Sequence, residues 1–482
     1  MKIGVKVTTT SQAGRSNSGT TSGRWFVAGL TERGPANTPT VIRSIAGFEA
    51  TFGGRTPYNS PFYDALRSFW EEGGAEAVIV RVVGADATSG SLDLADAETT
   101  SVMTLRASSP GAWSEQVQVA VSDTTGLSGT RSKIVVATPW GSEVFTQATA
   151  GELVSAINAR SQFLTAELTG APDSKPAAVD AKPLGAGDDK RSTIDGAAIV
   201  KAFEKFGADW GTGSVSAPGY PADIVGEGLL IHAAQMNRVA LLAGESGATE
   251  ADMLELAQSL SGGDFGEFGT LIYPHITVPD GTTARTAPPE GFAAAKRAVG
   301  HAQIGPWHAP AGDFSTATWV MGTESVVDTT MNERLADGRV TGITTAGSKT
   351  RLYGWWSLSE DVENFRLLTA RDMLNYLADA AAKVLEPYVF SVIDGRGLLT
   401  GQVESSLIGV LDPIARAGGF FPLHDDEGNE IDPGYRVIVD DTINTTDTVQ
   451  ENKVVAKVSV RLAPTATLIE LEIVKVPFTA GL

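Results

Sequence analysis

The most constraining feature of this sequence is a strand–helix–strand pattern between residues 24 and 84. A hydrophobic run at 25–30 predicts the first strand, and a run rich in Val and Ile at 77–83 predicts a second, buried strand. A helix is predicted between them, from Ser60 to about Glu72, because apolar side chains recur there at helical spacing. Parallel strands joined through a helix take a right-handed crossover, so this stretch predicts an α/β core.

Capping residues mark the starts of two predicted helices. Ser60 is a good N-cap, and Pro61 suits the first position of the helix that follows. Later in the chain, Thr369 is predicted to cap a helix, with Asp372 completing a capping box three residues on. A further helix is predicted at 401–417.

The sequence patterns predict a mixed α/β protein of several domains. Short alternating segments separated by turn residues predict an all-β insertion after the first α/β segment, and helices and strands alternate again after it. The predicted parts are an N-terminal arm and linker (1–23), an α/β core segment (24–84), a β-rich insertion domain (85–195), an α/β domain (196–345) and a C-terminal domain that ends in a strand arm (346–482).

Both ends of the chain carry a short pattern of alternating residues, which is typical of a strand. Ile3, Val5 and Val7 share one side near the N-terminus, and the polar stretch 8–23 that follows is typical of a flexible linker. Near the C-terminus, apolar Ile469, Leu471 and Ile473 alternate with glutamates. Each of these strands either pairs within its own chain or reaches a neighbouring one.

Charge and composition exclude several classes of function. Asp and Glu outnumber Lys and Arg by 57 to 37, which gives a net charge of −20 and argues against nucleic-acid binding and against docking on an anionic membrane. The chain has no cysteine, so disulfide and thiolate chemistry are excluded. It has no apolar run of about 18 residues and no apolar signal-peptide core at its start, so synthesis in the cytoplasm is expected.

A search for catalytic, cofactor-binding and metal-binding motifs finds only near misses. None of the five histidines has the spacing of a zinc pair, and His232 is predicted to be a core or interface residue. The stretch 342–350 nearly spells a phosphate-binding loop, but Ser348 interrupts it and a strand is expected to follow. A turn is predicted at 244–247 and a solvated hairpin turn at 425–430. The sequence therefore predicts no catalytic residue, no cofactor site and no metal site.

An ordered set of motifs resembles the contractile-tail sheath proteins of phages and related injection systems. The motifs are Gly34-Pro35, Phe48-x-x-x-Phe52-Gly53, Val80-Arg81-Val82, Ser109-Pro110-Gly111-x-Trp113, Pro288-Pro289-x-Gly291, Gly305-x-Trp307-x-Ala309-Pro310-Ala311 and the helix after Thr369. The chain departs from the family pattern in three places. Ser114 stands where glycine is usual, Trp356 stands where arginine is usual, and 390–394 does not match the usual Phe-Glu-Pro-Asn.

The resemblance implies a structural subunit that polymerises as stacked rings around a tail tube and contracts to drive the tube through a host envelope for genome delivery. It implies as partners further copies of this chain, the tube protein, and the baseplate and tail terminator proteins. It places the protein in the virion tail and, during assembly, in the host cytoplasm. In this family the terminal strands interlock neighbouring subunits, which implies this role for residues 2–7 and 468–476.

Two alternatives remain open from the sequence. The first is the sheath of a bacterial contractile injection or secretion system, which has the same architecture. The second is an α/β enzyme of the hydrolase type with a β insertion, which would need a convergent pocket of acid, base or metal-binding groups.

Overall fold

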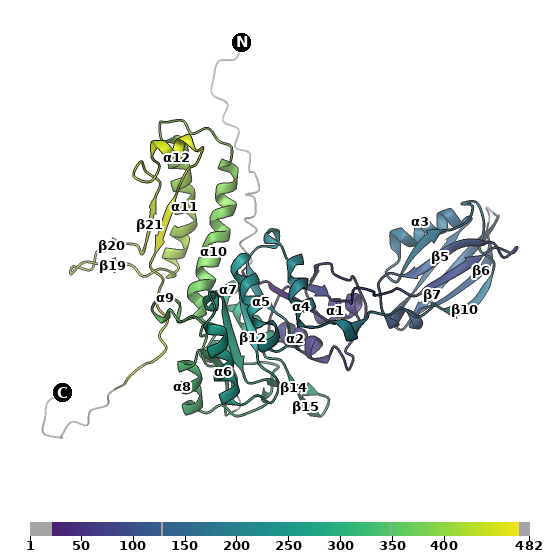
Figure 1. The fold of residues 1–482 in the computed structure, drawn as a ribbon, viewed down its shortest axis with the longest axis horizontal. Coiled ribbons are helices and arrows are strands. Elements are labelled where there is room, and N and C mark those ends of the chain that lie inside the picture. Colours follow the sequence, from purple (N-terminus) through teal and green to yellow (C-terminus); the bar gives the residue numbers. More distant parts are fainter. Residues whose placement is uncertain (1–21, 127–128, 348, 472–482) are drawn as a thin grey trace, which may run out of the picture. The chain divides into compact units, whose positions relative to one another are not determined.

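The computed structural model describes residues 22–126, 129–347 and 349–471 (Figure 1). Its contacts divide the chain into two compact units. Unit 1 comprises the residues up to Gln303 together with Pro310–Tyr376, and unit 2 comprises Ile304–Ala309 together with the residues from Leu377 onward. Helices and strands are mixed in both units, which confirms the predicted mixed α/β class. The predicted strand at residues 2–7 lies outside the described residues.

Unit 1 is built on an eight-stranded sheet with the order β18-β17-β13-β12-β11-β1-β3-β2. The strands are β1 (Trp25–Gly29), β2 (Thr40–Ile42), β3 (Ala77–Arg81), β11 (Gly213–Ser216), β12 (Arg238–Ala243), β13 (Gly269–Tyr273), β17 (Val340–Ala346) and β18 (Lys349–Leu352). Neighbouring strands from β17 to β3 are parallel. The two edge strands, β2 and β18, are short and run antiparallel to their neighbours.

Helices cover both faces of this sheet, and alternate residues of each strand belong to different cores. Phe26 of β1 faces a core that helices α4 and α5 complete, whereas Trp25 packs on Phe69 of α2, with ring centroids 4.9 Å apart. The helices of unit 1 are α1 (Ile45–Phe52), α2 (Ser60–Glu71), α4 (Gly196–Ala202), α5 (Ala222–Gln235), α6 (Glu250–Ser261), α7 (Glu290–Gln303), α8 (Thr329–Asp337) and α9 (Val362–Phe365). A small sheet of β14 (Ile276–Asp280), β15 (Thr283–Ala287) and β16 (Gly322–Thr323) lies beyond β13 in the chain.

The strand–helix–strand pattern from which the sequence analysis began is confirmed with one correction. β1 and β3 are parallel neighbours in the sheet, and α2 lies between them in the sequence. Gly73, just after that helix, has φ +98°, as expected for a glycine that ends a helix. The helix includes Ser60 as its first residue, however, so the N-cap is Asn59. Pro61 stands within the first turn, where its missing N–H costs nothing.

The predicted β insertion is present as two sheets with one helix. One sheet contains β4 (Ser91–Ala95), β5 (Ser101–Ala107) and β9 (Leu164–Leu168), and the other contains β10 (Val179–Pro183), β6 (Gln118–Gly126), β7 (Gly129–Thr138) and β8 (Gly141–Gln147). Helix α3 (Ala150–Arg160) packs with both sheets on one apolar core. Trp113 is buried in this core. Ser114 is also buried, and its hydroxyl is satisfied there because it donates to the carbonyl of Gly185.

Arg81 explains why three of the sheath-like motifs occur together. Its guanidinium is fully buried and donates to the carbonyls of Gly34 (3.0 Å) and Pro110 (2.8 Å) and to the hydroxyl of Ser109. Burial lowers the pKa of Arg81 to about 10, and the nearby Asp189 opposes that shift. The Gly-Pro turn, the strand arginine and the Ser-Pro-Gly turn therefore form one hydrogen-bonded junction between the core and the insertion.

The Pro-Pro-x-Gly motif places α7 directly against α2. A Cβ on Gly291 would lie 1.9 Å from the carbonyl oxygen of Ala65, so only glycine allows this approach. Glu290, beside it, is fully buried, and burial raises the pKa of its carboxyl to about 7. The protein therefore holds a protonated carboxyl here at pH values where the unfolded chain would be ionised.

Replacing Glu290 with glutamine is expected to stabilise the protein at alkaline pH. The folded pKa of about 7 lies above the unfolded value, so the wild type loses stability as pH rises from about 4.5 to 7, and the loss is about 3 kcal/mol in total. A glutamine side chain cannot ionise and avoids that loss. Urea unfolding of both chains at pH 5 and pH 8 measures the difference, and a difference that does not change with pH would contradict this assignment.

Unit 2 contains the second half of α10 (Leu368–Leu385), α11 (Leu398–Arg416), α12 (Thr446–Gln450) and two small sheets. One sheet pairs β19 (Leu423–His424) with β20 (Glu430–Asp432), which confirms the hairpin predicted around 425–430. The other pairs β21 (Tyr435–Ile438) with β22 (Lys457–Val460). The predicted capping box is wrong, because α10 begins at Leu368 and the Asp372 carboxylate accepts from Arg297.

Candidate inter-subunit sites

The residues predicted to form inter-subunit strands are described only in part. Ile3, Val5, Val7 and Ile473 lie outside the described residues. Ile469 and Leu471 are described, and they are 87% and 78% exposed. Leu468 beside them is 74% exposed, so three large apolar side chains close together in sequence have no cover from the described part of their own chain.

The β21–β22 sheet has two strands, and among the described residues its outer edges carry no further strand. The main-chain N–H of Arg461 donates to the carbonyl of Gly434, the residue just before β21, so the main-chain groups of residue 461 lie on the β21 side of the strand. Alternation along the strand then points the main-chain groups of Val458 and Val460 away from β21. No strand of the described residues pairs with these groups, so within that part of the chain they form an open hydrogen-bonding edge.

The helices behind this sheet form a wider layer than two strands can cover. Val437 of β21 packs in one apolar cluster with α11, and Ala381 and Leu385 of α10 join the same cluster. Figure 1 shows β21 lying along α11. Two packed helices span about 20 Å, whereas strands lie about 4.8 Å apart, so the layer has room for roughly four strands.

The burial of the two helices agrees with this estimate. The apolar stripe of α11 is buried, as at Val403 and Leu407. The stripe of α10 within unit 2 is only half-buried at Leu377, Ala381 and Val384. A helix stripe that the described chain leaves half-covered indicates a surface that another strand can complete.

A polar contact fixes β21 on α11. The Tyr435 hydroxyl donates to the carboxylate of Asp412, which lies on α11. Burial and this hydrogen bond raise the pKa of Tyr435 to about 12. The tyrosine therefore stays a neutral donor throughout the physiological range and holds the sheet in register on its helix.

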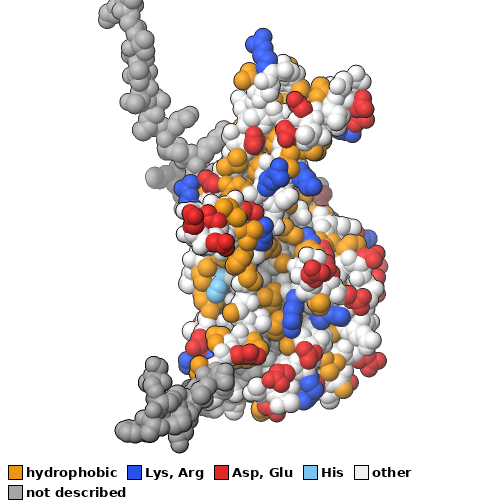
Figure 2. Space-filling model, turned by 90° about the vertical axis from the view of Figure 1, so that its left-hand side faces the viewer, with side chains coloured by type: hydrophobic (Ala, Val, Ile, Leu, Met, Phe, Trp, Pro, Cys, Tyr) orange, Lys and Arg blue, Asp and Glu red, His pale blue; other side chains and the backbone are white. Residues whose placement is uncertain are grey.

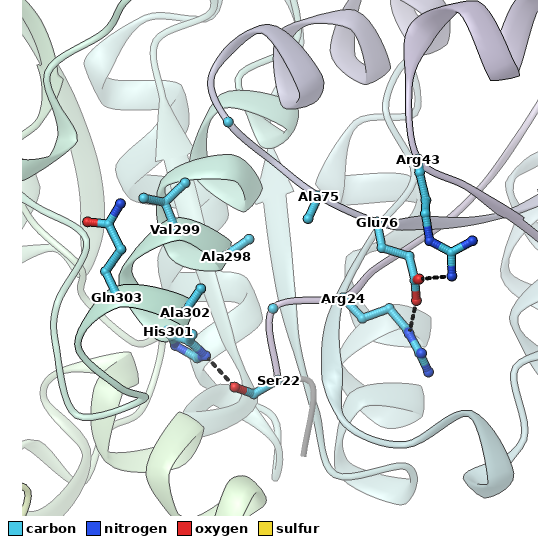
Figure 3. A pocket seen from close by; sticks show the side chains of 12 residues that line it. Ser22, Arg24, Arg43, Ala75, Glu76, Ala298, Val299, His301, Ala302 and Gln303 are labelled. Carbon is cyan, nitrogen blue, oxygen red and sulfur yellow. Dashed lines mark hydrogen bonds and ion pairs between the residues drawn. The ribbon is translucent and has the colours of Figure 1, made fainter. Parts of the chain in front are cut away.

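The first described residues of the chain, Ser22–Arg24, are held on two sides; we call them the arm root. The Ser22 hydroxyl lies 2.9 Å from His301 Nδ1 (Figure 3). The Ser22 carbonyl accepts from Arg297 at 2.6 Å. Arg24 donates to Glu76 at 2.6 Å. Sequence reasoning missed this cluster, although an arginine on the alanine-rich stripe of α7 was a signal for it.

A cavity of about 630 Å³ opens beside the arm root. Half of the residues that line it are small, including Gly23, Gly73, Ala298 and Ala302, and Figure 3 shows Glu76 and His301 at different parts of it. Glu76 bonds Arg24 and Arg43, and His301 bonds Ser22. The cavity is therefore an apolar recess whose titratable groups serve structural contacts.

The near-miss motifs have structural roles. Residues 340–346 and 349–352 form the β17–β18 hairpin, so a strand follows the glycine-rich stretch, as predicted. The turn after β12 is also confirmed, with Ser246 and Gly247 both donating to the Glu324 carboxylate. In the 425–430 turn the Asp425 carboxylate accepts from the main chain of Asn429.

His232 is buried, as predicted for a core residue, and its Nε2 lies 2.9 Å from Arg238. Because arginine can only donate, this nitrogen is the acceptor and the ring is neutral. Burial, with a smaller effect from the Arg238 charge, lowers the pKa of His232 to about 4.

This lowered pKa predicts a loss of stability in acid that His232→Gln should largely remove. The folded pKa of about 4 lies below the unfolded value of 6.5, so the histidine's contribution is complete above pH 6.5 and is lost as pH falls toward 4. At pH 4.5 the loss is about 2–3 kcal/mol. Urea unfolding of both chains at pH 7.5 and 4.5 measures it, and equal pH dependence in the two chains would refute it.

Charges and possible metal ligands give no sign of a reactive centre in the described residues. Lys and Arg are scattered among Asp and Glu on the described part of the face in Figure 2, without a continuous basic surface. Within residues 22–126, 129–347 and 349–471, no group of three His, Asp or Glu side chains could hold a metal ion. No described helix has the length and apolar character needed to cross a bilayer.

Comparison with known proteins connects this fold to sheath proteins. No protein-family model and no curated protein sequence matches the chain. Among solved structures, a sheath tail protein from Listeria innocua has a TM-score of 0.63 at 12% identity, over 87% of this chain and 89% of that one. A sheath tail protein from Desulfitobacterium hafniense has a TM-score of 0.58 at 12% identity, over 91% and 93%. The contracted helical sheath of the anti-feeding prophage has a TM-score of 0.57 at 16% identity, over 98% of both chains.

Proposed function

We propose that this chain, which has the fold of the tail sheath proteins, is the structural subunit of a contractile sheath. The likeness to the anti-feeding prophage sheath over 98% of both chains carries the proposal, because it includes unit 2 as well as the α/β core. In this function many copies surround a tail tube and shorten together, as rigid bodies that switch between two arrangements. The role is mechanical and needs no catalytic site.

Neighbouring copies are held together by strand addition in unit 2. The β21–β22 sheet offers open edges over a helix layer wide enough for two more strands. The candidate strands are residues 2–7 and 468–476 of neighbouring copies. Alternate residues of each are apolar, and the exposed Ile469 and Leu471 are of the kind that would cover the half-buried stripe of α10. Main-chain hydrogen bonds and this apolar contact supply the affinity.

Electron microscopy of the purified protein at high concentration, alone and with its tube protein, tests this function. Hollow, striated tubes are the expected result. Dispersed particles under both conditions would refute the sheath function, because the tube protein supplies the surface on which a sheath assembles.

We further propose that the sheath belongs to a phage tail that delivers a genome into the host. The support is the likeness to two solved sheath tail proteins, from Listeria innocua and Desulfitobacterium hafniense. The match to the anti-feeding prophage favours a second candidate, the sheath of a contractile injection system. Particles purified from the producing cells separate the two, since only a phage particle contains DNA that resists nuclease.

A further inference from the structure

We propose that Arg297 and Asp372 form a clamp that passes tension from the N-terminal arm to helix α10. The inference rests on the proposed sheath function, in which a neighbouring copy pulls on that arm. It concerns a different place from the strand-exchange sheet, because the clamp acts where the arm joins unit 1. Arg297 and Asp372 are thus positioning residues for the arm.

The clamp is a closed set of contacts among three segments. Arg297 on α7 donates from Nε to the Asp372 carboxylate on α10 at 3.0 Å, and from Nη1 to the Ser22 carbonyl at 2.6 Å. His301, one turn further along α7, contacts the Ser22 hydroxyl through Nδ1 and lies 3.6 Å from Asp372 through Nε2. The arm root, α7 and α10 therefore meet at one guanidinium and one carboxylate.

Burial makes these contacts hard to exchange for water. Arg297 and Asp372 are each 1% exposed, and Ser22 is 5% exposed. Burial by itself raises the pKa of Asp372, but the charges of Arg297 and His301 outweigh it and hold this pKa below its usual value. The carboxylate stays ionised, so the guanidinium keeps its orientation toward Ser22. If the Ser22 carbonyl moved away, the buried Arg297 guanidinium would lose one hydrogen-bond acceptor, which is energetically unfavourable.

The arm root is also held on its other side. Arg24 bonds Glu76 just before β3 and the carbonyl of Trp210 at 2.7 Å, and Gly23 lies so close to Ala298 that a Cβ would approach its main chain to 3.3 Å. A pull on residues preceding Ser22 is therefore resisted by α7, β3 and α10 together. Helix α10 is one element through which this load can leave unit 1, because its residues from Leu377 onward belong to unit 2.

A single thiol at the arm root tests the clamp. The chain has no cysteine, so Ser22→Cys gives one buried reporter whose main-chain carbonyl still accepts from position 297. Arg297→Lys keeps a positive charge for Asp372 but lacks the planar fork that also reaches Ser22. With this change we expect the introduced thiol to react with a maleimide at least tenfold faster. Arg371→Lys, one residue before Asp372 on α10, is the matched control and should leave the rate unchanged.

Sheared sheaths test the transmission of tension. Tubes of Arg297→Lys should break into shorter pieces at a shear rate that leaves wild-type and Arg371→Lys tubes intact. Gly23→Ala would place a Cβ 3.3 Å from the main chain of Ala298 and press the arm root away from α7, while both residues of the α7–α10 ion pair are kept. It should reproduce both effects if Arg297→Lys fails to fold.

Each possible outcome decides part of the proposal. An unchanged labelling rate would overturn the clamp. Faster labelling with tubes of wild-type strength would overturn its role in tension. If even the wild type forms no tubes, the proposed function and the tension role fail together, and the labelling rates still decide whether the clamp exists.

Discussion

Removing residues 1–8, or ending the chain before Thr467, is expected to give folded monomers that form no sheath tubes. Each truncation removes one of the two alternating segments, and neither removes an element of the described core. The loss should be nearly complete, because every contact between copies in the lattice repeats the same missing strand. Tube yield by electron microscopy and monomer unfolding by circular dichroism provide the two measurements.

The polar linker provides the control for both truncations. Removing four residues within 9–14 shortens the chain without touching the apolar residues at 3, 5 and 7, and tubes should persist. Normal assembly of either truncated chain would show that its arm takes no part in strand exchange.

Val458→Pro is expected to abolish tube formation while leaving the monomer stable. The main-chain N–H of Val458 points away from β21, so proline removes a donor only from the open edge. Val458 is 39% exposed, and the change should alter the unfolding free energy by no more than about 1 kcal/mol. Sedimentation of assembled tubes should show at least a tenfold lower yield.

Val458→Thr separates the hydrogen bond from the side chain. It retains the main-chain N–H and the β-branched shape, so its tubes should form at the wild-type yield. If proline and threonine assemble equally well, the free edge of β22 does not receive a partner strand.

Local patterns predicted the elements but not the contacts that join them. The helix between β1 and β3 was predictable because its apolar spacing and end residues are local signals. The Arg81 junction was not, because its acceptors at Gly34 and Pro110 are carbonyls that any residue type could supply. The sequence motifs contain the residues of that junction but do not indicate that these residues are hydrogen-bonded to one another.

Asp372 shows how a correct local rule can fail. Its spacing from Thr369 fits a capping box, and a helix does begin there. A buried arginine on α7 competes for the same carboxylate, and a charged, fully buried partner outweighs the main-chain bond of a helix cap. The competitor lies 75 residues away in sequence, beyond the reach of any local pattern.

Of the two predicted strand arms, the structure describes residues of the C-terminal one only. Ile469 and Leu471 are exposed, and Ile3, Val5, Val7 and Ile473 lie outside the described residues, so the role of these residues between subunits stays a prediction. No sequence pattern indicated that α10 and α11 form a layer wider than the β21–β22 sheet. That mismatch arises only when the helices and strands pack together.

The short antiparallel edge strands of the large sheet affect how readily the protein aggregates at high concentration. β2 has three residues and β18 has four, so the edges of the large sheet give an incoming strand few main-chain groups to pair with. Non-specific pairing of a strand from another chain is therefore disfavoured at both edges of this sheet. Under the proposed function, copies join through the open edge of unit 2, so the edges that limit unwanted pairing and the edge that serves assembly belong to different sheets of one chain.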